Sequence, residues 1–81
     1  MQENIQVSYF KTNLKSLMLK KSVEVDKALN RSDVAKATGL SIPTVSRWYE
    51  GRVDRLESET IERLKSFFNC EFDDLVEYVD E

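Results

Sequence analysis

The stretch LNRSDV, residues 29–34, carries the pattern that starts an α-helix, and it is the strongest local constraint on the fold of this 81-residue chain. Asn30 is a preferred N-cap residue, and the carboxylate of Asp33, at the third helical position, can accept a hydrogen bond from the cap amide. Leu29 and Val34 flank them and can pack together as a hydrophobic staple. A helix is therefore predicted to begin directly after Asn30.

The same pattern returns eleven residues later in LSIPTV, residues 40–45. Ser41 takes the cap position and Thr44 the third helical position. Pro43 falls in the first turn, where its missing N–H has no helical partner to lose. Between the two helix starts, Gly39 suits the left-handed residue that ends a helix. The spacing predicts two short helices joined by a tight turn, a helix-turn-helix at about 30–50.

The spacing of apolar residues predicts three further helices, at about 8–20, 58–69 and 72–79. The inward residues of the first are Phe10, Leu14, Leu17 and Met18. Those of the second are Ile61, Leu64, Phe67 and Phe68, and those of the third are Phe72, Leu75, Val76 and Val79. Residues 20–29 show no clear period and are interpreted as a connector that can extend the first helix. Before that helix, Ile5 and Val7 alternate with polar residues, as in a short strand.

Length and composition agree with this pattern. The chain has only two Gly and one Pro, which favours helices with short connections, and 81 residues is near the lower end of what buries a self-sufficient core. We therefore expect one domain over residues 1–81, of the all-α class. It would have five helices around the central helix-turn-helix and an acidic C-terminal segment at about 71–81.

Several classes of protein are disfavoured by what the sequence lacks. It has no apolar run long enough to span a membrane, and MQENIQVSYF does not resemble a signal peptide, so a cytoplasmic protein is expected. The single Cys70 cannot form an internal disulfide. With no His in the chain, Ser–His and Cys–His pairs are excluded and a zinc site is improbable. We expect no enzymatic activity, no metal and no cofactor.

Charge is distributed unevenly along the chain. The net charge is −3, yet residues 1–30 and 31–55 each carry +2, and residues 56–81 carry −7. The helix-turn-helix therefore lies in mildly basic surroundings. For binding to an anionic polymer, the local field of one face matters more than the total charge.

The segments SDVAKATGLSIPTVSRWYEG and LESETIERLKSFFNCEFDDLVEYV resemble the phage-repressor/Cro-type helix-turn-helix family, also called XRE-like. The ending is similar to a bacterial subgroup with a C-terminal "DLLEY"-like segment. This resemblance implies a compact five-helix, lambda-repressor-like DNA-binding domain, in which the helix at about 42–50 enters the major groove of double-stranded DNA. It also implies a homodimer on a two-fold operator.

The resemblance also assigns roles to individual residues. The residues expected to face the bases are Ile42, Pro43, Thr44, Ser46 and Arg47. Those expected to meet phosphate are Arg31 and Arg52 by resemblance, Lys36 and Arg55 as basic neighbours of the motif, and Tyr49 through its hydroxyl. Val45 and Trp48 are expected to face the core. The chain departs from the family in a longer connector before the helix-turn-helix and in Ile42-Pro43, which replaces a common polar pair.

Each assignment has an alternative. Arg47 has donors that fit guanine O6 and N7, but it can instead pair with Glu50 on the surface. Thr44 can read DNA or only help to cap its helix. The Tyr49 hydroxyl can contact phosphate, or its ring can cover the edge of the core.

Two functions follow from these observations. The first is a sequence-specific, double-stranded DNA-binding transcriptional regulator of the repressor type. The alternative is a protein-interaction module, antitoxin-like or an adaptor, that binds a basic protein partner through its acidic C-terminal end.

Overall fold

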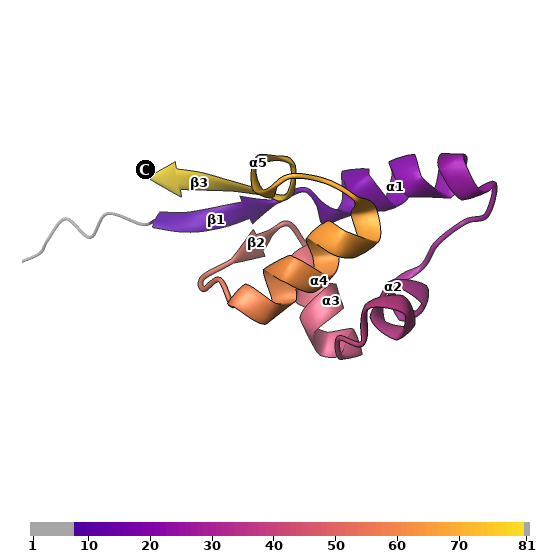
Figure 1. The fold of residues 1–81 in the computed structure, drawn as a ribbon. Helices are drawn as coiled ribbons and strands as arrows, with labels where there is room; N and C mark the ends of the chain where they lie inside the picture. The colour runs from indigo at the N-terminus through magenta and orange to yellow at the C-terminus, as the bar shows by residue number, and fades with distance from the viewer. Residues whose placement is uncertain (1–7, 81) are drawn as a thin grey trace, which may run out of the picture.

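The structure is a computed structural model that describes residues 8–80 (Figure 1). Over this range the chain forms five helices and three strands. Their order is β1 Ser8–Thr12, α1 Leu14–Val25, α2 Arg31–Thr38, α3 Ile42–Tyr49, β2 Arg52–Val53, α4 Ser58–Phe68, α5 Phe72–Leu75 and β3 Val76–Asp80.

The three strands form one antiparallel sheet in the order β2-β1-β3, so the expected all-α class is wrong. β1 is the central strand and pairs with both neighbours. Phe10 lies opposite Val53 on β2 and opposite Tyr78 on β3. The fold is a helix-turn-helix with a small sheet made largely from the two ends of the described chain.

The N-terminal part differs from the predicted helix at 8–20. Residues 8–12 form β1, and the ring of Phe10 lies 5.4 Å from the ring of Tyr78 instead of continuing a helical stripe. α1 begins only at Leu14 and continues to Val25, so much of the expected connector is helical. The segment that contains Ile5 and Val7 lies outside the described residues.

The predicted C-terminal helix is also divided. α5 ends at Leu75 after four residues, and Val76 begins β3. Leu75 and Val76 are buried as predicted, but Val76 and Val79 are β-branched residues that fit a strand. The predicted inward position of Phe72 is wrong, because its side chain is 39% exposed, and Val79 is half-buried. The spacing of i, i+3, i+4 and i+7 therefore located two of the four side chains in the core and did not identify the strand.

The hydrophobic core collects residues from every helix and from β2 and β3. Leu14, Leu64 and Leu75 are fully buried, and they belong to α1, α4 and α5. Val45 and Trp48 of α3 are buried as well, which confirms their predicted place. None of the helices in residues 8–80 has the length and apolar character needed to cross a bilayer.

A two-residue junction, Thr12 and Asn13, connects the sheet to the helix-turn-helix and to α5. The Thr12 amide donates to the Gly51 carbonyl at 3.0 Å, and the Thr12 hydroxyl donates to the carbonyl of Trp48. The Asn13 amide donates to the Leu75 carbonyl at 3.0 Å. The end of β1 therefore holds the end of the helix-turn-helix and the end of α5 in fixed relation.

Candidate nucleic-acid interface

The first helix of the motif begins as the sequence predicted. The Asn30 side chain accepts a hydrogen bond from the Asp33 amide at 2.8 Å, and the Asp33 carboxylate accepts one from the Asn30 amide at 3.0 Å. This reciprocal capping box satisfies amides that a helix leaves without partners. Gly39 ends the helix in the left-handed conformation, with φ of 79°.

The second helix begins with a related arrangement of two hydroxyl groups. Ser41 Oγ accepts from the Thr44 amide at 3.2 Å, and the Ser41 hydroxyl donates to Thr44 Oγ1 at 2.8 Å. Thr44 therefore takes part in the start of α3, in agreement with the interpretation that it helps to cap its helix.

The turn between the two helices is supported from α4 by Arg63, a residue to which the sequence assigned no role. Arg63 Nη1 donates to the Thr38 carbonyl at 2.7 Å, and the other side of the guanidinium pairs with Glu59 at 2.7 Å. A Cβ atom on Gly39 would lie 2.6 Å from Arg63 Nη1. Arg63 thus connects the end of α2 to α4, and the positive φ of Gly39 favours glycine at the turn.

α3 has one buried face and one exposed face. Val45 and Trp48 are 0% and 3% exposed, and they anchor the helix. At 100° per residue, Pro43, Ser46 and Arg47 lie on the opposite face, and Ile42 lies at its edge. Pro43 and Arg47 are exposed, Ser46 is half-buried, and Ile42 is 52% exposed. Thr44 and Tyr49 lie on the two flanks of the helix.

Arg47 of α3 and Arg55 of the loop after β2 lie beside each other in one hollow. They line a shallow hollow of about 170 Å³ together with Thr44, Asp54 and Glu57. The ion pair found within residues 8–80 joins Arg63 to Glu59, and none joins Arg47 to Glu50. The surface alternative for Arg47 is therefore not formed, although two carboxylates lie in the same hollow.

Tyr49 lies on the other flank, where three helices meet. Its ring is half-buried and packs against the edge of the core, in agreement with one of the two interpretations of its role. Arg31 at the start of α2 places its guanidinium carbon 4.9 Å from the ring centroid, and Lys15 of α1 places Nζ 5.7 Å from it. Lys15 was not among the residues singled out from the sequence.

Arg52 is held by a second aromatic ring. Its guanidinium carbon lies 4.0 Å from the centroid of the Tyr9 ring on β1, and Arg52 is directly opposite Lys11 in the register. Lys36 is exposed in the last turn of α2, apart from these clusters. The predicted phosphate contacts are thus distributed over α2, the end of α3, β2 and the loop after it.

The acidic C-terminal segment, α5 and β3, lies away from α3. Figure 1 shows α2 and α3 on one side of the molecule and α5 and β3 on the other. The strand order agrees, because β2 follows α3 directly and β3 is at the opposite edge of the sheet. Asp73, Asp74 and Glu77 are exposed there. This separation leaves the exposed side of α3 in the basic part of the chain.

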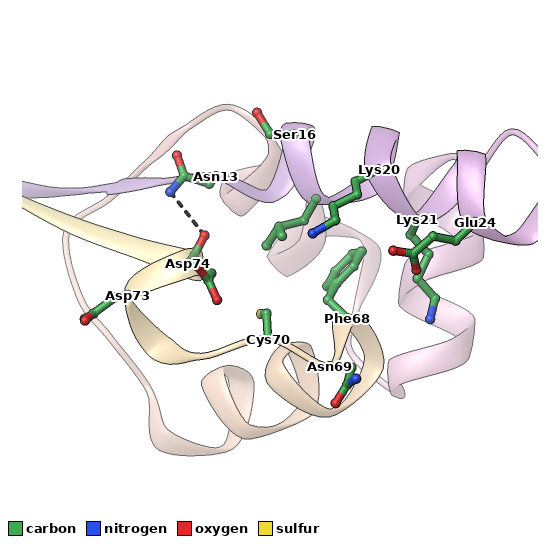
Figure 2. Close-up of a pocket in the computed structure, with 11 residues that line it drawn as sticks. Asn13, Ser16, Lys20, Lys21, Glu24, Phe68, Asn69, Cys70, Asp73 and Asp74 are labelled. Carbon is green, nitrogen blue, oxygen red and sulfur yellow. Dashed lines mark hydrogen bonds between the residues drawn. The ribbon is translucent and has the colours of Figure 1, made fainter.

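A second, larger hollow of about 700 Å³ lies between α1 and the α4–α5 turn (Figure 2). Lys20 and Lys21 line it on one side and Asp73 and Asp74 on the other, so its charges are mixed. Asn13 Nδ2 donates to the Asp74 carbonyl at 3.2 Å across one end.

Cys70 also lines this hollow. Burial, aided by Asp74 and Glu71, raises the pKa of the Cys70 thiol, which favours the protonated form. Within residues 8–80, no three metal-binding side chains gather at one place.

A helix-turn-helix whose second helix exposes polar and basic residues defines a class of nucleic-acid-binding protein. The family model of the Cro/C1-type HTH DNA-binding domain matches residues 13–81, and the chain belongs to this family. Its fold is similar to the crystal structure of transcriptional regulator VanUg, Form II, with a TM-score of 0.64 and 20% identity. The match covers 99% of this chain and 100% of the other. The comparison with curated proteins gave no significant match.

Proposed function

We propose that the protein is a sequence-specific, double-stranded DNA-binding transcriptional regulator of the repressor type, with α3 in the major groove. One observation carries the proposal: α3 is anchored by Val45 and Trp48 while its opposite face is free for contact. Membership of a DNA-binding family supports it. An α-helix fits the major groove, where every base pair presents a distinct pattern of donors and acceptors.

Phosphate contacts would supply most of the affinity. Arg31, Lys36, Arg52 and Arg55 surround α3 and are exposed. Each cation that neutralises a phosphate releases a counterion, so the affinity falls as salt rises. Such contacts set the position of the protein on the duplex without reading its sequence.

Sequence readout would depend on few side chains. Arg47 presents two N–H groups that match guanine O6 and N7, and Ile42 can pack on a thymine methyl. The hydroxyl groups of Ser46 and Thr44 can donate to bases or phosphates. Pro43 adds only apolar contact. This set gives a narrow polar code centred on Arg47.

A homodimer is part of the proposal, because one module of this size makes few base contacts and family members pair on two-fold operators. The C-terminal segment offers a surface for it. β3 is an edge strand within the described sheet, and Tyr78 on it is 57% exposed. An edge strand can pair with another chain.

The test is substitution of Arg47 after selection of a bound duplex from a random pool. Arg47→Ala should weaken the selected duplex by about 1–3 kcal/mol and relax the preference at one base pair. Arg52→Ala is the comparison variant, and it should weaken all duplexes alike. Fluorescence anisotropy measures both. If Arg47→Ala keeps wild-type affinity and preference, the role of α3 is wrong.

A second candidate is a protein-interaction module. The exposed Asp73, Asp74 and Glu77 on the side away from α3 favour it, because a basic partner could bind there without meeting the helix-turn-helix. Reversing these three charges should leave DNA binding unchanged and abolish capture of a basic partner. Loss of DNA binding in that variant would instead connect the acidic side to the first function.

A further inference from the structure

Lys15, Arg31 and Tyr49 come from three different helices and meet at one aromatic ring. The two cations lie 5.7 Å and 4.9 Å from the ring centroid, and both side chains are exposed. We propose that they form one phosphate-binding site for the DNA backbone, in which Lys15 and Arg31 are the donors and Tyr49 is a positioning residue. This inference rests on the proposed function and deepens it.

The position of both cations in their helices points to an anion. Lys15 is in the first turn of α1, which contains no acidic residue, and Arg31 is the first residue of α2, whose first turn contains Asp33. The N-terminus of a helix carries a partial positive charge, so a cation there is poorly placed for stability alone. The same end attracts phosphate, because free amides and the helix dipole both favour negative charge.

Carboxylates do not neutralise this pair. Within residues 8–80 the ion pair found joins Arg63 to Glu59, and neither Lys15 nor Arg31 has a carboxylate oxygen within 4.0 Å. The nearest acid in sequence, Asp33, is already held by the Asn30 amide in the capping box. Two cations near one ring repel each other, and a bound phosphate anion would reduce that repulsion.

The two sides of α1 differ in this respect. The hollow of about 410 Å³ beside Lys15 and Tyr49 is lined by apolar and hydroxyl side chains and by no acid. Lys20 lines the hollow on the other side together with Glu24, Asp73 and Asp74 (Figure 2). Lys20 therefore shares its hollow with acids, although it forms no ion pair with them, whereas none of the described residues that line the Lys15 hollow is acidic.

The Tyr49 ring would act by holding the donors in place. A cation over an aromatic face is attracted by the ring quadrupole, which restricts the freedom of a long side chain. A donor that is already oriented loses less entropy when it meets phosphate. Because the ring positions the donors, the hydroxyl of Tyr49 is not required.

The experiment compares two lysines on one helix. Lys15→Gln and Lys20→Gln remove the same charge from α1, and each variant is titrated on the selected duplex by anisotropy at several salt concentrations. Lys15→Gln should lower affinity up to about fivefold, the scale of one exposed ion pair. It should also reduce the slope of log K against log salt by about 0.9, which Lys20→Gln should not do.

A second pair of variants tests the positioning role. Tyr49→Phe keeps the ring and should keep the wild-type salt slope, whereas Tyr49→Leu removes the ring and should weaken binding. In the Tyr49→Leu background, Lys15→Gln should have a smaller effect than in the wild type. If Tyr49→Phe loses as much affinity as Tyr49→Leu, the hydroxyl is the contact and positioning by the ring is overturned.

The outcomes separate this inference from the proposed function. If the wild-type protein binds the duplex and Lys15→Gln behaves like Lys20→Gln, the phosphate site is wrong and the DNA-binding function remains. If the wild-type protein binds no duplex even at low salt, both are wrong. Thermal unfolding of each variant is measured in parallel. If Tyr49→Leu unfolds, the phosphate site is tested by Lys15→Gln and Tyr49→Phe, which keep the packed atoms.

Discussion

The helix-turn-helix and the sheet are built from contacts of different range. Residues 30–50 are specified by neighbours: two caps, a glycine turn and a buried face on α3. The sheet joins β1 to β3, from opposite ends of the described chain. Thr12 and Asn13 connect the two, because they bond to Trp48 and Gly51 on one side and to Leu75 on the other.

This difference implies that the two regions fail in different ways. A substitution in the helix-turn-helix should remove one local interaction, whose contribution to the free energy of unfolding can be measured by itself. A change in the C-terminal part should release the junction at Thr12, and with it the packing that holds α3. The three substitutions below test this comparison from its largest expected effect to its smallest.

Leu75→Ala should have the largest effect on stability. Leu75 is fully buried at the end of α5, and truncation of a buried leucine to alanine costs about 2–5 kcal/mol through lost transfer energy and a residual cavity. Chemical denaturation followed by Trp48 fluorescence and by circular dichroism should show one shared transition at lower denaturant. Two separate transitions would show that sheet and helix-turn-helix unfold independently, contrary to the coupling inferred here.

Gly39→Ala should have an intermediate effect. The left-handed backbone costs a residue with a Cβ roughly 1–2 kcal/mol, and the new Cβ would displace the Arg63 guanidinium from the turn. Gly51→Ala is the matched control, since Gly51 is also left-handed but the nearest atom, the Thr12 carbonyl oxygen, is 4.0 Å away. The free energies of unfolding of the two variants give the cost of moving Arg63 by difference, and equal values would remove Arg63 from the account of the turn.

Asn30→Ala should have the smallest effect. It removes one side of the capping box at the start of α2 and should cost about 1 kcal/mol. Glu57→Ala serves as the control, because the Glu57 side chain caps no amide of α4 and accepts only a long hydrogen bond, 3.5 Å, from the Thr60 hydroxyl. Urea unfolding should therefore separate the two variants. Equal stability would mean that the first helix of the motif owes little to its cap.

The sequence predicted the helix-turn-helix well for a physical reason. Asn30, Gly39 and Ser41 act on backbone groups within a few residues of themselves, so their pattern is readable without the rest of the fold. The buried positions of Val45 and Trp48 follow from helical spacing once the helix start is known. Five helices were predicted, and five are present within residues 8–80.

The prediction of an all-α fold was wrong in the segments whose contacts join distant parts of the chain. Phe10 and Val76 occupy positions that fit a helical stripe, and no local signal shows that their strands pair with each other. Short apolar segments are ambiguous between helix and strand, and only the partner decides. The sequence did contain a weak sign, since Val76 and Val79 are β-branched and residues 8–12 include two aromatics and a threonine.

The candidate site shows the same division. The residues on the exposed face of α3 were predictable because helical geometry places them there. The positions of Lys15 over Tyr49 and of Arg63 at Thr38 were not, because each depends on how separate helices pack. Their charge was visible in the sequence, but their neighbours were not.

The pairing of β1 with β3 also has a consequence for how the protein folds. The pair consists of the first and the last strand of the described chain, so its formation closes a long loop. Contacts of such high sequence separation slow folding. During synthesis, residues 8–12 have no β3 partner until residues 76–80 have been made. The helix-turn-helix can form its local bonds long before then, and the final strand is the step that secures it.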